Sequence, residues 1–153
     1  MSCPEKAHWQ AVKWILRYLR GTSNCSLEFG RNNDTLVSFV DSDYAGDLDR
    51  RRSLSGYGFC IGGCAVSWKA TLQPVVVLSN TEAEYMAMIE AIKQALGLKS
   101  LFAELSLHQD TIAEGKVLVQ KISTKENPAD MFTKSLPVYK FKQYLNWYSL
   151  LLI

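Results

Sequence analysis

The clearest fold signal in the chain is the stretch GYGFCIGGCAVSWK, which occupies residues 56–69. Two runs rich in strand-forming residues, Gly56–Ile61 and Cys64–Lys69, are separated only by Gly62 and Gly63. A two-residue glycine connection between such runs is typical of a β-hairpin, because glycine adopts the positive φ angles that a tight hairpin turn requires. The sequence therefore predicts an antiparallel pair of strands near the middle of the chain.

Elements of both kinds flank this hairpin. Before it, Cys25–Phe29 and Thr35–Val40 have the composition of strands, and Pro4–Leu19 has apolar residues at helical spacing. After it, Ser79 and Glu82 form a capping-box pattern, in which a serine cap is followed three residues later by a glutamate. We expect a long helix from this cap to about residue 105. Its predicted apolar side comprises Tyr85, Met88, Ile89, Ile92, Leu96 and Phe102.

The last third of the chain predicts one more strand and two helices. Val117–Ile122 alternates like a strand, and Asn127-Pro128-Ala129-Asp130 has the cap, first-turn proline and acid that open a helix. Val138–Leu152 is expected to be a final helix. Antiparallel strands followed by a strand–helix–strand crossover indicate an α/β protein with a mixed sheet and helices packed on it.

Length and composition bound the class of protein. The 153 residues suit one domain, and 48% hydrophobic with 21% charged residues argues against disorder. The net charge of +2 argues against a dedicated duplex-binding module, which is usually more basic. No apolar run reaches the ~20 residues of a membrane span, and no signal-peptide pattern opens the chain. We expect an intracellular protein without membrane contacts, with Cys60 and Cys64 as reduced core residues rather than metal ligands.

Three acidic residues stand where predicted elements begin or end. Asp41 ends a strand, Glu84 lies in the first turn of the long helix, and Asp130 lies in the first turn of a later one. Carboxylates brought together repel one another unless a cation joins them, and hard oxygen ligands suit Mg²⁺ or Mn²⁺. Two such ions can support phosphodiester hydrolysis. From spacing alone, helix caps and solvated acids are the favoured reading.

The exact strings point to a known family. They are collinear along most of the chain from Cys3 to Pro137, and together they resemble the ribonuclease H domain of copia-type (Ty1/copia) retrotransposon polyproteins. The strings are VDSDYAGD (40–47), RRSLSGY (51–57), AVSWK (65–69), QPV (73–75), LSNTEAEY (78–85) and NPADMFTK (127–134). A further string, HWQAVKWILRYLRG (8–21), is similar to the segment at the end of the preceding reverse-transcriptase region.

The resemblance implies a fold, an activity and a set of site residues. The fold is a five-stranded mixed sheet flanked by helices, and the activity is cleavage of the RNA strand of an RNA–DNA hybrid. Four carboxylates would hold two Mg²⁺ (or Mn²⁺) ions. Asp41 matches the first acid, Glu84 the second and Asp130 the fourth, while Glu82 is the rival of Glu84 and is assigned to the helix cap. Asp41 and Glu84 are then expected to lie within roughly 10 Å of each other, because they would share adjacent ions.

One part of the family pattern is missing. After the long helix the family has a strand that carries the third acid, followed by further helical segments, and this chain has none of them. We infer an internal deletion near 110–113. The resulting division is a reverse-transcriptase remnant at 1–24, a truncated ribonuclease H-like domain at 25–137 and a C-terminal helix at 138–153. With the inner strand absent, Val117–Ile122 is expected to pair in parallel with Thr35–Val40.

The missing acid shapes the functional hypotheses. A ribonuclease H-like hydrolase, an endonuclease by ancestry, is expected to be inactive without its third metal ligand. The alternative is a non-catalytic module that binds nucleic acid or a partner, with Arg50, Arg51 and Arg52 contacting phosphates. A third reading is an expressed remnant with no selected role. The expected partners are an RNA–DNA hybrid or other nucleic acid and, ancestrally, the reverse-transcriptase domain of the same polyprotein.

Overall fold

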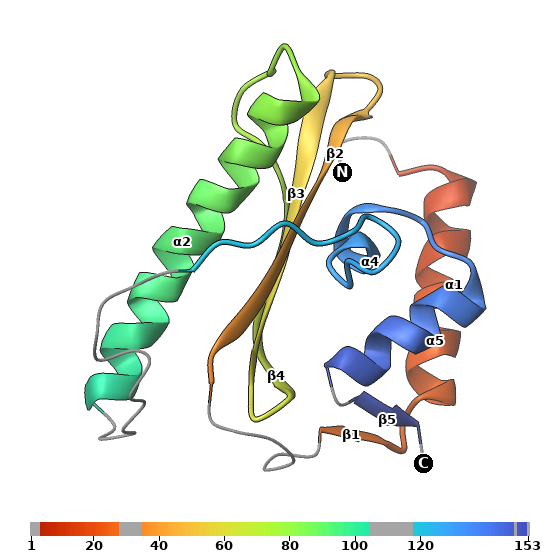
Figure 1. The fold of residues 1–153 in the computed structure, drawn as a ribbon. Helices are drawn as coiled ribbons and strands as arrows, with labels where there is room; N and C mark the ends of the chain where they lie inside the picture. The colour runs from red at the N-terminus through yellow and green to blue at the C-terminus, as the bar shows by residue number, and fades with distance from the viewer. Residues whose placement is uncertain (1–3, 28–34, 105–117, 149, 153) are drawn as a thin grey trace.

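The computed structural model describes residues 4–27, 35–104, 118–148 and 150–152, and these form helices packed on two small antiparallel sheets (Figure 1). None of the described helices is both long enough and apolar enough to cross a membrane. The elements in chain order are α1 (Lys6–Gly21), β1 (Cys25–Leu27), β2 (Val37–Asp47), β3 (Arg52–Ile61), β4 (Cys64–Leu72), α2 (Asn80–Glu104), α4 (Asp130–Thr133), α5 (Val138–Trp147) and β5 (Leu150–Leu152).

The larger sheet has the order β2-β3-β4, with both pairs antiparallel. The predicted hairpin is confirmed: β3 and β4 pair on either side of Gly62 and Gly63, whose φ angles are 58° and 77°. Strand β2 is longer than predicted, because it continues to Asp47 through the first half of the charged connection. An irregularity in the register between Asp43 and Asp47 accommodates this extension.

The central strand β3 is buried on both faces, and its two faces differ in side-chain size. Tyr57 and Phe59 point to one face, where they pack with Ala91 of α2. On the other face, Gly56 and Gly58 leave room for the C-terminal helices. Because side chains alternate along a strand, the large residues of β3 support α2 while the small ones admit α4 and the residues around Tyr148.

Helix α2 begins and ends close to its predicted bounds, but it packs with a different face. The side chain of Ser79 accepts a hydrogen bond from the backbone N–H of Glu82 at 3.1 Å, as the capping pattern predicts. The predicted apolar side is wrong in part, because Tyr85 and Leu96 are more than half exposed. The buried residues are Ala83, Ala87, Ala91 and Phe102. Alanine lets the helix approach the sheet closely, and the larger residues then lie on its flanks.

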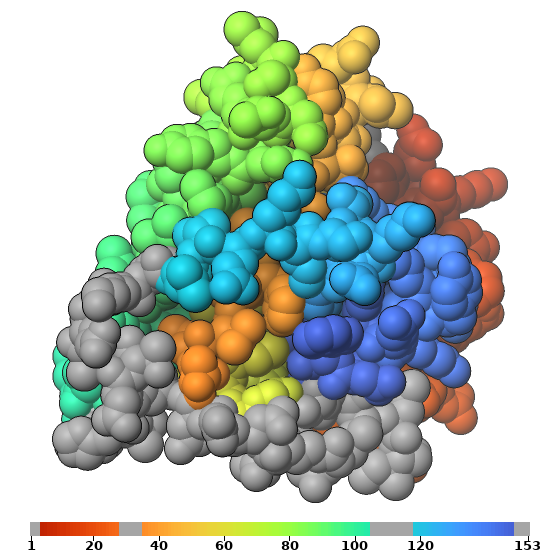
Figure 2. Space-filling view, in the orientation of Figure 1, coloured from red at the N-terminus to blue at the C-terminus, as the bar shows by residue number. Residues whose placement is uncertain are grey.

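The predicted parallel strand and crossover are wrong. Residues 118–123 form no regular structure, and Leu118 and Val119 are 81% and 61% exposed. Figures 1 and 2 show the segment 118–127, in cyan, running across β2 from the side of α2 to α4. In place of a ladder, the side-chain amide of Asn127 donates to the carbonyl of Val40 at 2.9 Å. A side chain thus takes an edge acceptor that a pairing strand would have used, and the described sheets are purely antiparallel.

The C-terminus also differs from the prediction. The expected helix over Val138–Leu152 ends at Trp147, and Leu150–Leu152 forms β5, which pairs antiparallel with β1. The aromatic ring of Tyr148 is buried at the helix end, within 6.4 Å of the Phe39 ring and 5.6 Å of the Phe132 ring. The buried ring fixes the chain where it leaves the helix, and this contact could not be read from helical periodicity.

We predict that Gly58→Ala destabilises the protein by about 1–3 kcal/mol through overpacking. A Cβ at this position would lie 2.7 Å from Cε1 of Tyr148 and 2.9 Å from Cε2 of Phe132. Gly97→Ala is the matched control, because its Cβ would meet none of the described residues within 4 Å and alanine favours the helix by about 1 kcal/mol. Urea unfolding measures both variants. A neutral Gly58→Ala would contradict the packing of Tyr148 on β3.

We also predict that Cys60 is inert to alkylation in the folded protein. Burial, with a smaller contribution from Cys64, raises the pKa of Cys60 from 9.0 to about 12. The folded thiol therefore stays neutral at pH 8.5, where its thiolate fraction is roughly 10³-fold below that of the unfolded chain. Iodoacetamide labelling followed by mass spectrometry should modify Cys60 only in denaturant, while the half-buried Cys25 serves as the native control. Fast native labelling of Cys60 would contradict this environment.

Candidate functional site

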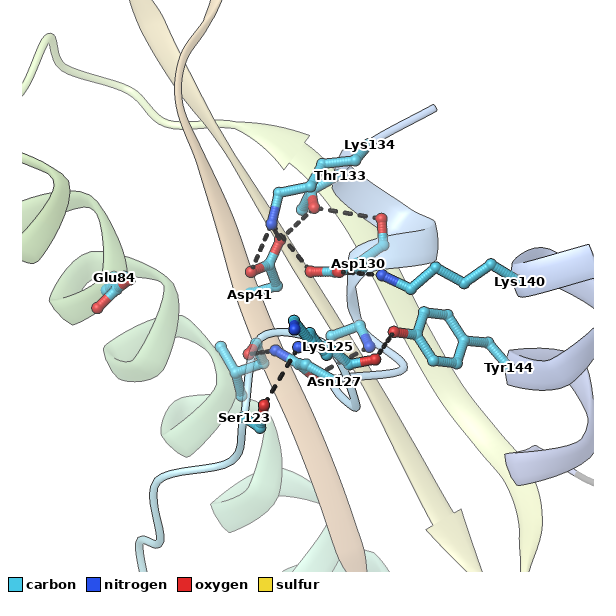
Figure 3. Close-up of polar contacts among 12 residues, drawn as sticks. Asp41, Glu84, Ser123, Lys125, Asn127, Asp130, Thr133, Lys134, Lys140 and Tyr144 are labelled. Atoms are coloured by element: carbon cyan, nitrogen blue, oxygen red, sulfur yellow. Dashed lines mark hydrogen bonds and ion pairs between the residues drawn. The ribbon is translucent and has the colours of Figure 1, made fainter. Parts of the chain in front are cut away.

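Asp41 and Asp130, two of the three predicted site residues, lie at one point where β2 meets α4 (Figure 3). Asp41 is in the middle of β2 and points to the face covered by the C-terminal helices, and its side chain is 12% exposed. Asp130 opens α4 and its side chain is 3% exposed. The structure thus brings together carboxylates from two elements that are far apart in the sequence.

Lys134 joins the two carboxylates. Its Nζ lies 3.0 Å from Oδ2 and 3.1 Å from Oδ1 of Asp41, and 2.9 Å from Oδ1 of Asp130. Lys140, from α5, lies 3.3 Å from the other oxygen of Asp130, and the hydroxyl of Thr133 donates to Oδ2 of Asp41. Two acidic and two basic side chains therefore form a neutral group, which we call the Asp41–Asp130 cluster.

The charges of the two lysines are stabilised within this cluster. Burial acts to lower the pKa of Lys134, but its hydrogen bonds to Asp130 and Asp41 outweigh that effect and raise the pKa above 10.5. The pKa of Lys140 is raised mainly by its contact with the Tyr144 hydroxyl, and further by Asp130. Stability from these raised values is fully present below pH 10.5 and is lost only as the pH rises through the folded pKa values. Both ammonium groups therefore stay charged at neutral pH.

Asn127 fixes the segment that carries Asp130. Its Nδ2 donates to the carbonyl of Val40, and its Oδ1 accepts the backbone N–H of Ala129 at 3.1 Å. Asn127 is 93% buried, and the Pro128 that follows it is fully buried. The predicted asparagine cap is therefore displaced: α4 begins at Asp130 with Ala129 at its N-cap position and no side-chain cap bond, while Asn127 closes the turn before the helix and ties it to β2.

Glu84, the third predicted site residue, does not join the cluster. Its carboxylate accepts a hydrogen bond from Nδ2 of Asn80 at 3.0 Å on the exposed side of α2. Figure 3 shows it on the helix, apart from Asp41 and without a contact to it. Glu84 and Asp41 both line a cavity of about 650 Å³ between β2, α2 and the segment 118–124. Their expected approach within roughly 10 Å stays a prediction.

A site for Mg²⁺ or Mn²⁺ would need several oxygen ligands free to face the ion. Within the described ranges, no group of three or more His, Cys, Asp or Glu side chains is arranged to hold a metal ion. All four carboxylate oxygens of Asp41 and Asp130 already accept bonds from Lys134, Lys140 or Thr133. The arrangement of the cluster therefore does not fit a divalent cation.

The predicted phosphate-binding arginines lie elsewhere. Arg50 and Arg51 are exposed in the turn that joins β2 and β3, and Arg52 begins β3 in a half-buried position. Arg51 has a φ angle of 55°, which belongs to the tight turn. Figure 1 places this turn at the end of the sheet, away from α4. The arginines and the Asp41–Asp130 cluster therefore lie in separate parts of the molecule.

Sequence reasoning did not identify Lys134, Lys140 and Thr133 as members of the site. One local signal was available, since Lys134 stands four residues after Asp130, at the spacing that suits a helical ion pair. No local pattern links Lys140 with Asp130, because the contact depends on how α5 turns back after Pro137.

Comparison with known proteins shows what the chain is similar to. No family model and no solved structure matches it. It is 41% identical over 91% of its length to the retrovirus-related Pol polyprotein from transposon TNT 1-94 of Nicotiana tabacum. It is 50% identical over 63% of its length to secreted RxLR effector protein 161 of Plasmopara viticola. It is also 25% identical over 86% of its length to a transposon Ty1 Gag-Pol polyprotein of Saccharomyces cerevisiae.

Two of these three relatives are polyproteins of transposons. Within that class, the chain is homologous to part of the Ty1/copia retrotransposon Pol polyproteins. The matched region spans 13% of the tobacco polyprotein and 67% of the effector protein. The tobacco alignment is 175 positions long, whereas the chain has 153 residues, so the relative has at least 22 aligned positions without a counterpart here.

We predict that Asn127→Ala lowers the free energy of unfolding by about 1–3 kcal/mol, because it leaves the carbonyl of Val40 without its donor. Asn80→Ala is the matched control: its amide bonds the exposed Glu84, and the change is expected to stay within about 0.5 kcal/mol. Thermal or urea unfolding separates the two. Equal effects would contradict the role of Asn127 as a tie between β2 and the segment before α4.

Proposed function

We propose that the chain is a ribonuclease H-like fragment of a copia-type Pol polyprotein that no longer catalyses hydrolysis. The ancestral activity in this proposal is cleavage of the RNA strand of an RNA–DNA hybrid with Mg²⁺ or Mn²⁺. The observation that carries the proposal is the meeting of Asp41 and Asp130 between β2 and α4, closed by Lys134. The two motif acids are adjacent, as a hydrolase site would need, but the ammonium group of Lys134 occupies the space between them.

Three features support the loss of activity. A third carboxylate does not join the pair among the described residues. Glu84, the proposed second ligand, bonds Asn80 instead. The cluster is neutral, so it offers little attraction to a dication, whereas two-metal hydrolysis needs several carboxylates placed within about half an ångström.

We predict no cleavage of an RNA–DNA hybrid above background with either Mg²⁺ or Mn²⁺. The assay uses a labelled hybrid, with an active ribonuclease H as the positive control. Asp41→Asn should leave the background unchanged, because Asp41 holds no metal in this proposal. Cleavage that Asp41→Asn abolishes would overturn the proposal and would mean that other acids of the chain complete the site.

A second candidate is a non-catalytic nucleic-acid-binding module, favoured by the exposed Arg50 and Arg51 in the β2–β3 turn. Binding of a hybrid through phosphates would weaken steeply with salt, and replacing both arginines by glutamine would reduce the slope of log K against log salt by about 1–2. Replacing the exposed Lys93 by glutamine is the control.

The reverse-transcriptase region remains the proposed ancestral partner. The side chains of α1 that would face it are exposed, namely Trp9, Ile15, Leu16 and Leu19. The free thiols of Cys60 and Cys64 suit the intracellular location proposed for the chain.

A further inference from the structure

We infer that Lys134 takes the place of a divalent cation between Asp41 and Asp130, which makes the pair a metal-independent clamp that holds the C-terminal helices to the sheet. The inference concerns the arrangement of this chain's own side chains. It does not depend on the proposed descent from a ribonuclease H, because the contacts stand whatever the ancestral activity was.

The position of the ammonium group is the first argument. Nζ of Lys134 lies within 3.1 Å of both oxygens of Asp41 and 2.9 Å from one oxygen of Asp130. Mg²⁺ would need oxygens at about 2.0–2.1 Å in octahedral geometry. An ion bridging the same two carboxylates would have to lie in the space that Nζ occupies, so the lysine and the metal exclude each other.

The completeness of the bonding is the second argument. Lys140 satisfies the oxygen of Asp130 that Lys134 does not reach, at 3.3 Å, and Thr133 donates to Asp41. The two negative charges are balanced by two positive charges, and both carboxylates are largely buried. Buried carboxylates without such partners are strongly unfavourable. The chain therefore supplies from its own lysines the charge that a cation supplies in a metal site.

The positions of the four charged residues show what the clamp joins. Asp41 belongs to β2, Asp130 and Lys134 stand at the two ends of α4, and Lys140 belongs to α5. Helix α4 has only four residues and could not hold its position alone. Figure 3 shows the ammonium groups converging on the carboxylates from two sides. The clamp thus fixes the short helix against the sheet and brings the start of α5 with it.

The experiment is a titration with Mn²⁺ and Mg²⁺ that does not use activity. In the wild-type protein, millimolar Mn²⁺ should leave the amide resonances of Asp41 and Asp130 unbroadened, and Mg²⁺ should leave the midpoint of thermal unfolding unchanged. In Lys134→Met, the midpoint should fall by about 10 °C. Millimolar Mn²⁺ should then recover part of that loss, because the two carboxylates are left without their shared partner.

Two further variants are controls. Lys93→Met removes an exposed lysine that pairs with Glu90 within α2, and it should change neither the midpoint nor the response to Mn²⁺. Asp41→Asn combined with Lys134→Met removes one charge of each sign, and it should unfold at a higher temperature than Lys134→Met and show no response to Mn²⁺.

The outcomes are distinct. Site-specific broadening by Mn²⁺ at Asp41 and Asp130 of the wild-type protein would overturn the inference, and this measurement does not require any variant to fold. A folded Lys134→Met that loses no stability would also overturn it. Hydrolysis of a hybrid without wild-type metal binding at this pair would refute the proposed loss of activity while leaving the clamp intact.

Discussion

The burial of β3 on both faces is the constraint on which the rest of the structure depends. A strand with two covered faces needs a layer on each side, and β3 meets this need with large side chains on one face and glycines on the other. Because Tyr57 and Phe59 are large, a helix that packs closely on them needs small residues, and the buried residues of α2 are mostly alanines. Gly56 and Gly58 admit Phe132, Thr133 and Tyr148 at close range. The unequal faces of one strand thus determine which helix lies where.

The second layer combines an apolar cluster around Tyr148 with polar contacts that position α4. Helix α4 is too short to bury a wide stripe, and its place is fixed by the Asp41–Asp130 cluster and by the bond from Asn127 to Val40. Buried ion pairs add little net stability compared with apolar packing, but the removal of one partner is costly because the other charge remains buried. Such contacts specify a single arrangement, and here they specify how the short helix α4 packs on β2.

Local signals made part of this structure predictable. The Gly62-Gly63 hairpin and the Ser79 cap of α2 depend on neighbouring residues alone, and both are confirmed. The predicted Asn127 cap lies in the turn before α4, whose N-cap position is Ala129. The parallel pairing of Val117–Ile122 with Thr35–Val40 depended on tertiary context, and it is wrong because Asn127 takes an edge acceptor of β2. For the site, the motif indicated Asp41 and Asp130. The positions of Lys134 and Lys140 depend on how the chain turns after α4, and the spacing of residues in the sequence does not predict that turn.

The two departures from the expected fold have a common physical basis. In the proposed descent, the segment that would have paired beside β2 is lost, which removes both a row of backbone partners and a metal-binding acid. Unpaired edge groups and unbalanced carboxylates are both expensive when buried. The amide of Asn127 bonds an edge carbonyl of β2, and the ammonium of Lys134 balances the charge of the carboxylates. Both residues lie within one short stretch, NPADMFTK. In the proposed descent, a segment that once supplied a metal ligand would now support the edge of the sheet.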